Sequence, residues 1–346
     1  MNKVVIASIR RNSGKTSLIV GLAHVMGKKF AYLKPFGDRL YYRKKRLWDY
    51  DSALMANLFS LKENPEDMSI GFEHTKVRYM YNDETIKQKL AEMISDIQGD
   101  NDILLIEASE HLTYGASVNL DAISLARNTG SRLIFVLSGD EGAVMDDLSF
   151  LKKCVCMEGV DFAGVIINKV QDVEDFKETH LDCIKDMGIP VLGIIPFEVE
   201  LTYLSVNNIV ERLFVKVMGG ESGLNRTIKN VIIGAMNADV AMKEPVFKKE
   251  GKLVITAGDR SDMIVAALES NTSGIVITND IVPSSTIIAK ASEYNIPLLL
   301  VSEDTYQVAR QIDSIEPILT KGDAKKIEIV KKMVKENLDL NVLFPE

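Results

Sequence analysis

The sequence has few cysteines and histidines and no long apolar run, and each shortage excludes a class of protein. Only three of the 346 residues are cysteine and four are histidine, and their scattered positions match neither a disulfide framework nor a zinc-ligand spacing. No apolar run approaches the ~20 residues that cross a bilayer, and a strand pattern begins almost at the first residue, where a signal peptide would lie. We therefore expect a cytoplasmic protein with structural or incidental thiols and no membrane contact.

An excess of basic residues is also absent. Lysine and arginine number 41 against 49 aspartate and glutamate residues, which gives a net charge of −8 at pH 7. Proteins that bind nucleic acid usually present a basic surface, so we expect no nucleic-acid partner. With 46% apolar and 26% charged residues the composition is that of a folded globular protein. At ~150 residues per domain, the length predicts about two domains.

Short apolar runs alternate with helical patterns over the first part of the chain. Strands are predicted at residues 3–9, 30–33, 103–107, 133–137, 164–168 and 191–195, with helical stretches such as 15–26 and 85–97 between them. Strands that alternate with helices form a parallel sheet that helices cover on both faces. The sequence therefore predicts an α/β fold with a parallel sheet and a binding site at the carboxyl ends of its strands.

A second, smaller α/β series follows. A helical stretch ends in the Gly- and Ser-rich segment 218–223, which indicates a loop or linker. The tail, residues 323–337, carries apolar residues at helical spacing, so we expect an amphipathic helix that packs on its own domain rather than on a partner or a membrane. The predicted domains are residues 1–204 and 205–322, followed by a helix and tail at 323–346. Strands of the second series are predicted at 231–235, 253–257, 274–278 and 297–302.

The segment 8–16 has the chemistry of a phosphate-binding loop. Its core, Ser13-Gly14-Lys15-Thr16, stands between the first predicted strand and the first predicted helix. Loop amides and a helix N-terminus point donors at anionic oxygens, Lys15 would reach the β- and γ-phosphates, and the Thr16 hydroxyl would bind Mg²⁺. Ile9 stands where such loops usually open with glycine. The alternative is an ordinary helix start.

Two acidic residues fit the same site. Glu107 closes an apolar strand, so its carboxylate emerges beside the loop and could bind Mg²⁺ directly or through water; it could instead cap the next turn. Asp51 stands just before a helical run, and on its own the pattern favours a helix N-cap over a metal ligand.

In this order the motifs of residues 3–206 resemble the dethiobiotin synthetase family of P-loop enzymes, and above all the related N-terminal domain of long phosphotransacetylases. The resemblance implies ATP and Mg²⁺ as ligands, with the metal on Thr16, Asp51 and Glu107. It implies that Lys15 and Lys34 are catalytic and that Lys34 faces substrate; the alternative for Lys34 is an exposed lysine at a strand end. The nucleotide-binding residues it implies are Asn12, Ser13, Gly14, Lys15, Thr16, Ser17, Asn168, Lys169, Pro196 and Glu198.

Two functions follow from the resemblance. In the family reaction an amine captures CO₂ as a carbamate, which attacks the γ-phosphate of ATP, so we expect phosphoryl transfer to a small carboxylate or carbamate. The alternative is a nucleotide-responsive regulator. Retention of Lys34 favours the enzyme, whereas the segment Ala108-Ser109-Glu110-His111, which replaces the family's glycine run, favours the regulator. Arg10 and Arg11 add charge to a loop that is usually less basic.

The second series resembles the DRTGG module of the same phosphotransacetylases, on the segments 233–236, 254–262 and 304–306. Arg260 in this module could bind an anion at a strand end or form a salt bridge within a turn. In those proteins a phosphotransacetylase domain follows, whereas the sequence given ends at Glu346, so acetyl transfer to phosphate is not expected. We expect a homodimer that acts on a small-molecule substrate.

Overall fold

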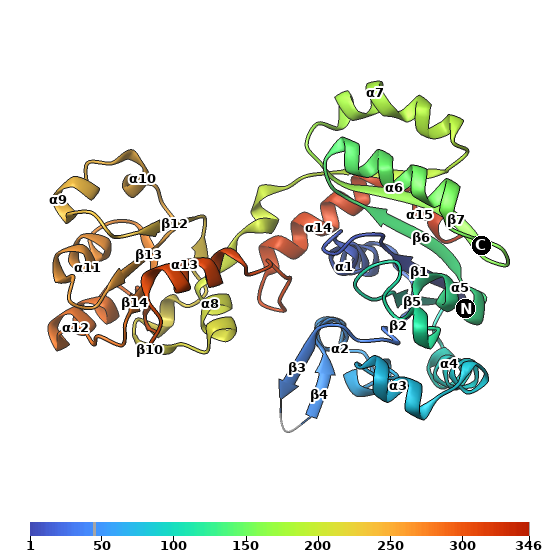
Figure 1. The fold of residues 1–346 in the computed structure, drawn as a ribbon, viewed down its shortest axis with the longest axis horizontal. Helices are drawn as coiled ribbons and strands as arrows, with labels where there is room; N and C mark the ends of the chain where they lie inside the picture. Colours follow the sequence, from blue (N-terminus) through green and yellow to red (C-terminus); the bar gives the residue numbers. More distant parts are fainter. Residues whose placement is uncertain (44–45, 346) are drawn as a thin grey trace. The chain divides into compact units, whose positions relative to one another are not determined.

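Two compact units make up the part of the chain that the computed structural model describes, residues 1–43 and 46–345. The first unit comprises Met1–Glu198 and Leu319–Glu346, and the second comprises Val199–Ile318 (Figure 1). The domain ends expected from the sequence, residues 204 and 322, lie a few residues further along the chain. No helix among the described residues is both long and apolar enough to cross a membrane.

The first unit is built on a six-stranded sheet in the order β2–β5–β1–β6–β7–β8, with every neighbouring pair parallel. The interior strands are buried on both faces, as expected for continuous apolar runs in a parallel sheet. The predicted α/β class is therefore confirmed. The strands are β1 Asn2–Ala7, β2 Phe30–Leu33, β5 Ile103–Glu107, β6 Arg132–Leu137, β7 Asp161–Val170 and β8 Val191–Pro196.

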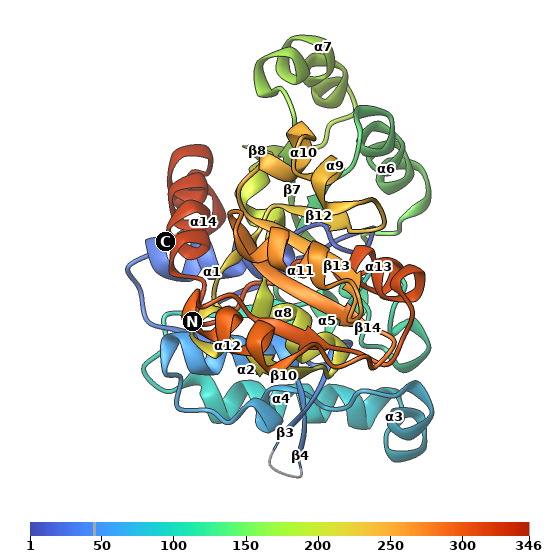
Figure 2. The ribbon, with the colours of Figure 1, turned by 90° about the vertical axis from the view of Figure 1, so that its left-hand side faces the viewer.

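Helices follow the strands as the alternating pattern predicts, and a hairpin that the pattern does not predict stands between β2 and α2. The hairpin consists of β3 Leu40–Arg43 and β4 Arg46–Asp49, and it projects from the first unit in both views (Figures 1 and 2). The helices are α1 Lys15–Val25, α2 Tyr50–Phe59, α3 His74–Met80, α4 Asp83–Gln98, α5 Ala122–Thr129, α6 Glu141–Cys154 and α7 Val173–Asp186.

The C-terminal tail forms the predicted amphipathic helix, which belongs to the first unit although the strands directly before it in the sequence belong to the second. This helix, α14 Ala324–Asn337, lies beside α1 in the first unit, and a short helix, α15 Leu340–Leu343, follows it (Figures 1 and 2). Gly21 of α1 allows the close approach, because a Cβ there would lie 2.5 Å from the Val334 side chain. Leu338 then bridges to Gly193 of β8. The amphipathic spacing predicts an apolar face without specifying what that face contacts.

The second unit is a five-stranded sheet in the order β10–β15–β14–β13–β12, parallel except for the β10–β15 pair. Helices α9 to α12 pack on one face, and α8 and α13 on the other. The strands are β10 Lys216–Gly219, β12 Asn230–Ile233, β13 Lys252–Ala257, β14 Thr272–Thr278 and β15 Leu298–Leu300, with a small pair β9 Leu204–Ser205 and β11 Thr227–Ile228. The helices are α8 Val206–Leu213, α9 Ala238–Ala241, α10 Pro245–Lys248, α11 Ser261–Leu268, α12 Ser285–Glu293 and α13 Thr305–Asp313.

The linker predicted at 218–223 is wrong. Gly219 belongs to β10, and Gly220 lies in the left-handed region with φ of 76°. A Cβ on Gly220 would lie 2.2 Å from the Ile296 carbonyl oxygen, and one on Gly223 would lie 2.1 Å from that of Asn295. These glycines therefore serve close packing inside the second unit rather than chain flexibility.

Candidate functional site

The loop between β1 and α1 has the shape of an anion-binding turn. Gly14 begins α1 with φ of 92°, and no side chain caps the helix N-terminus. A Cβ on Gly14 would lie 2.4 Å from Asn168 Nδ2, so the position requires glycine. Asn12 also adopts a left-handed conformation, with φ of 56°. Such loops leave backbone N–H groups at a helix N-terminus available to an anion.

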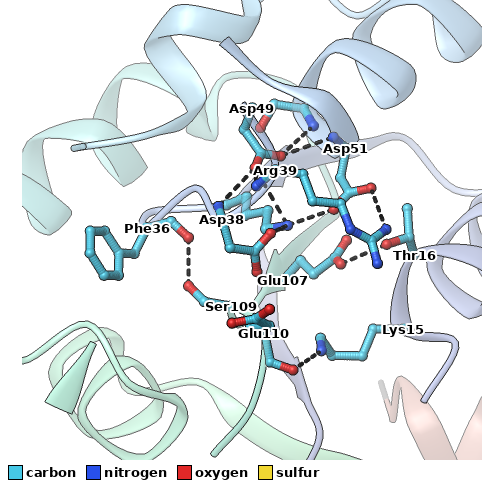
Figure 3. Close-up of polar contacts among 12 residues, drawn as sticks. Lys15, Thr16, Phe36, Asp38, Arg39, Asp49, Asp51, Glu107, Ser109 and Glu110 are labelled. Carbon is cyan, nitrogen blue, oxygen red and sulfur yellow. Dashed lines mark hydrogen bonds and ion pairs between the residues drawn. The ribbon is translucent and has the colours of Figure 1, made fainter. Parts of the chain in front are cut away.

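Lys15 is folded over this loop. Its ammonium donates to Ser8 Oγ at 2.7 Å. It also donates to the Glu110 carbonyl oxygen at 3.2 Å (Figure 3). Burial lowers the pKa of Lys15 to about 8, although the nearby Glu107 carboxylate raises it. The Ser8 hydroxyl and the Glu110 carbonyl are neutral hydrogen-bond acceptors. An anionic oxygen would replace them as the partner of the Lys15 ammonium, because charge-assisted hydrogen bonds are stronger.

Thr16 and Glu107 meet where β1 and β5 end side by side. The Thr16 hydroxyl donates to Glu107 Oε1 at 2.8 Å (Figure 3), and the Tyr32 hydroxyl donates to Glu107 Oε2 at 2.8 Å. Burial raises the pKa of Glu107 to about 7. Both carboxylate oxygens thus accept from side chains rather than from the following turn, and the binding of Mg²⁺ by Glu107 stays a prediction.

Lys34 is buried, so the alternative of an exposed lysine is wrong. Its ammonium lies 2.6 Å from Asp38 Oδ1, 2.5 Å from Asp51 Oδ2 and 3.5 Å from Asp49 Oδ2. Burial alone would lower the pKa of Lys34, but the carboxylates of Asp51 and Asp49 raise it well above its usual value. Burial likewise opposes ionisation of Asp51, yet the Lys34 ammonium holds the pKa of that carboxyl below its usual range. Three carboxylates therefore surround one cation.

Asp49, which the sequence did not single out, organises this cage. It is the N-cap of α2, because its Oδ1 accepts from the backbone N–H groups of Asp51 and Ser52. The N-cap hypothesis for Asp51 is therefore wrong. Asp49 Oδ2 accepts from the N–H groups of Asp38 and Arg39, so one side chain joins both ends of the hairpin (Figure 3). Burial raises the pKa of Asp49 to about 6.

Arg39 connects the hairpin to the phosphate loop. Its Nη2 donates to Asn12 Oδ1 at 3.1 Å, and its Nη1 lies 3.7 Å from Asp51 Oδ1. Figure 3 shows the guanidinium extending toward Asp51 and Thr16. Sequence reasoning missed Arg39 and Asp38, because they belong to no recognised motif and the hairpin that brings them to the site was not predicted.

The pair Asn168 and Lys169 contacts the loop from the end of β7. Asn168 Nδ2 donates to the Ser13 carbonyl oxygen at 2.9 Å, and Lys169 Nζ donates to that of Asn12 at 2.6 Å. Lys169 adopts φ of 64°, a conformation that only a few per cent of non-glycine residues take. These contacts place the pair beside the phosphate loop; its contact with a nucleotide stays a prediction.

The remaining nucleotide positions lie at the ends of the same elements. Pro196 closes β8, where it pairs with Val170, and Glu198 follows it, half-buried. Ser17 is half-buried in the first turn of α1. The structure gives no test of what these three residues bind.

The charged residues of the loop have defined partners. Arg10 Nε donates to both carboxylate oxygens of Asp147 at 3.0 and 2.9 Å, and Arg11 Nη2 lies 2.8 Å from Glu110 Oε2. In the second unit Arg260 forms a turn salt bridge, with Nε 3.2 Å from Asp262 Oδ1. Its Nη2 also donates to the Met236 carbonyl oxygen at 2.8 Å. Arg260 therefore stabilises the loop after β12.

Oxygen donors suited to Mg²⁺ are present at the site. Thr16 and Glu107 offer a hydroxyl and a carboxylate that already touch, which is the hard donor type that Mg²⁺ prefers. The Asp51 carboxylate contacts Lys34 and Arg39, so it would have to release Arg39 to bind a metal directly. Asp38, Asp49 and Asp51 form a second group with metal-ligand spacing, but here the Lys34 ammonium supplies the positive charge. Thr16 and Glu107 therefore fit a metal best.

Comparison with known proteins finds relatives that share this arrangement of two parts. Phosphate acetyltransferase of Pseudomonas putida is 26% identical over 94% of this chain and 49% of that protein. The Nitratidesulfovibrio vulgaris enzyme is 22% identical over 99% of this chain and 51% of that protein. The chain thus spans about half the length of these curated relatives. The crystal structure of cobyrinic acid a,c-diamide synthase from Mycobacterium smegmatis is 14% identical, covers 57% of this chain and 84% of that chain, and has a TM-score of 0.34.

Two family models match the chain. The DRTGG domain model matches residues 208–315, within the second unit. The model described as AAA domain, AAA_26, matches residues 2–204, which is more than half of the chain and includes the phosphate loop, Lys34, Glu107 and Asn168. The chain therefore belongs to this AAA domain family of dethiobiotin synthetase-like P-loop proteins, with a DRTGG domain as its second part.

Proposed function

We propose that the first unit binds Mg²⁺-ATP and transfers the γ-phosphoryl group to a small carboxylate or carbamate. The observation that carries the proposal is the convergence of Lys15, Thr16 and Glu107 at the adjoining carboxyl ends of β1 and β5. A cation, a hydroxyl and a carboxylate at a helix N-terminus are the groups that phosphoryl transfer requires.

Different residues of the site would bind the phosphates, bind the metal and hold the loop in place. The loop amides and the Lys15 ammonium would hold the β- and γ-phosphates, and Thr16 and Glu107 would hold Mg²⁺, which neutralises phosphate charge when bound. Asn168 and Lys169 keep the loop in the shape that accepts phosphate, through their contacts with the Ser13 and Asn12 carbonyls.

The reaction exchanges one bond for another. A carboxylate or carbamate oxygen attacks the γ-phosphorus, the bond from the γ-phosphorus to the bridging oxygen breaks, and ADP leaves with the electron pair. The product is an acyl or carbamoyl phosphate that a second nucleophile can open. Positioning and charge neutralisation supply most of the rate acceleration in such transfers.

A second candidate function is a nucleotide-responsive regulator that acts through the DRTGG domain. The observation that favours it is the state of Lys34, whose side chain is 2% exposed and whose ammonium contacts Asp38 and Asp51. A lysine already neutralised in this way has little free charge to hold an anionic substrate against ATP. Catalysis through Lys34 would therefore require the cage to open.

ATP turnover distinguishes the two candidates. Calorimetry should detect Mg²⁺-ATP binding to the wild-type chain, weakened about 10- to 150-fold in Lys15→Ala, because a charge-assisted contact contributes ~1.5–3 kcal/mol. Phosphate release should then be measured with bicarbonate, diamines and small carboxylates. Stimulated release supports the ligase-type enzyme, whereas binding with no turnover under any condition supports the regulator. Equal affinity of wild type and Lys15→Ala would refute the nucleotide site itself.

A further inference from the structure

Arg39 stands at the base of the hairpin, and its backbone is held on both sides. Its N–H donates to Asp49 Oδ2 at 3.2 Å, and its carbonyl oxygen accepts from the Tyr50 N–H at 2.7 Å. Asp49 is fully buried and is the N-cap of α2, so this anchor belongs to the core of the first unit. The side chain of Arg39 can therefore exchange partners while its backbone stays in place.

The guanidinium of Arg39 reaches the phosphate loop and the Asp51 carboxylate at once. Nη2 donates to Asn12 Oδ1 at 3.1 Å, and Nη1 lies 3.7 Å from Asp51 Oδ1, with the group extending toward Thr16 (Figure 3). The Asp51 side chain is 2% exposed, whereas that of Arg39 is 33% exposed. Arg39 thus brings a positive charge to the site from the hairpin rather than from the loop.

These two contacts are weaker than those that a phosphate group would offer. The Asn12 amide oxygen carries no formal charge, and 3.7 Å to Asp51 exceeds the length of a hydrogen bond. Asp51 also shares its charge with the Lys34 ammonium, which lies 2.5 Å from its other oxygen. A guanidinium can bind two oxygens of one phosphate through parallel charge-assisted hydrogen bonds. A phosphate in the site would therefore draw Arg39 away from Asp51.

We propose that Arg39 binds the γ-phosphate of ATP and stabilises the negative charge that develops there during transfer. This inference rests on the proposed function and adds a residue to it. Lys15 approaches the nucleotide from the loop and would contact both the β- and the γ-phosphate. Arg39 approaches Thr16 from the hairpin, so it meets the terminal phosphate, which ADP lacks. Arg39 therefore distinguishes ATP from ADP, whereas Lys15 serves both.

Calorimetry of the full chain tests this role with two probes in Mg²⁺, ADP and the non-hydrolysable β,γ-imido analogue of ATP. Arg39→Ala should weaken binding of the analogue by at least about tenfold and leave ADP within about twofold, because one charge-assisted contact is lost from the terminal phosphate alone. Lys15→Ala should weaken both. Arg46→Ala is the matched control: this arginine begins β4, at the end away from Asp49, and its side chain is 62% exposed, so neither affinity should change.

Equal weakening of both nucleotides by Arg39→Ala overturns the proposal, since the residue then only shapes the loop through Asn12. Unchanged affinity for both overturns it too. In either case, wild-type binding that Lys15→Ala weakens leaves the proposed function standing. A wild-type chain that binds neither nucleotide refutes the proposed function and this inference together.

Far-UV circular dichroism checks that each variant is folded. If Arg39→Ala does not fold, Arg39→Lys takes its place, because it keeps a positive charge beside Asp51 but lacks the planar fork. It should weaken the ATP analogue by at least about threefold and leave ADP unchanged, since an ammonium makes no parallel pair of bonds to one phosphate. An unchanged ratio of the two affinities in this variant would overturn the proposal.

Discussion

Lys34 shows how one residue can stabilise a site by charge balance. Its ammonium is surrounded by Asp38, Asp49 and Asp51, so Lys34→Ala leaves buried carboxylates without a counter-charge. Removing one member of a buried ion pair costs ~3–5 kcal/mol, and we expect a loss of that size in the free energy of unfolding. Urea unfolding, followed by the fluorescence of Trp48, measures this loss in the free energy of unfolding. Trp48 is the single tryptophan, and it directly precedes Asp49 of the cage. Lys29→Ala, whose ion pair with Asp100 is exposed, is the control and should leave the midpoint unchanged.

Glu107 and Asp51 should respond differently to amide substitution. Glu107→Gln keeps one acceptor oxygen, for either Thr16 or Tyr32, and removes the charge that a metal needs, so it should weaken ATP binding in Mg²⁺ more than in EDTA. Asp51→Asn removes a charge that Lys34 and Arg39 share, so it should lower the unfolding midpoint as well. Calorimetry with each variant in both buffers gives the comparison. An identical response of Glu107→Gln and wild type to Mg²⁺ would contradict the metal assignment.

Among the elements, α14 depends on one glycine for its place on the first unit. A Cβ at Gly21 would lie 2.5 Å from Val334 Cγ2 and 3.1 Å from the Val330 carbonyl oxygen. Gly21→Ala should therefore destabilise the contact by ~1–3 kcal/mol, as overpacking does, although alanine favours helix. Hydrogen exchange of residues 324–337 should rise in this variant. Gly142→Ala, in the exposed first turn of α6, offers a matched control in which exchange of α14 stays as in wild type.

The sequence predicts an element well when residues adjacent in the chain determine it, and poorly when contacts between distant residues do. Strands β2 and β5 have the predicted ends, because each is a continuous apolar run that stands between polar residues. The phosphate loop is recognisable for a similar reason, since its residues are adjacent in sequence. The hairpin is different: β3 and β4 pair with each other outside both sheets, and Asp49 joins their ends through contacts with Asp38 and Arg39. No periodicity encodes such contacts, so the Lys34 cage could not be predicted.

At the scale of the whole molecule, the chain leaves the first unit near residue 198 and returns to it near residue 319. Limited proteolysis should therefore cut at these two junctions, in the segment 197–203, which holds only a short 3-10 helix at Val199–Thr202, and in the irregular segment 314–323, and spare the buried glycines at 219–223. The expected products are the second unit and two pieces of the first. Mass spectrometry identifies the cleavage sites, and cleavage inside 219–223 would contradict the assignment of those glycines to a packed unit.

The two pieces of the first unit should stay together after cleavage. The C-terminal piece carries α14, whose Ile327, Val330, Met333 and Val334 are buried beside α1 and β8. Burial of a large aliphatic side chain contributes ~1.5–3 kcal/mol, so four of them can hold a peptide without a covalent link. The peptide should co-elute with the residue 1–198 fragment in native gel filtration and separate from it in denaturant. With Gly21→Ala the peptide should dissociate at a lower denaturant concentration than it does with glycine at that position, because the clash removes ~1–3 kcal/mol of the larger sum that the four side chains contribute. Release at the same denaturant concentration in that variant would show that α14 is held by contacts other than its apolar face on α1.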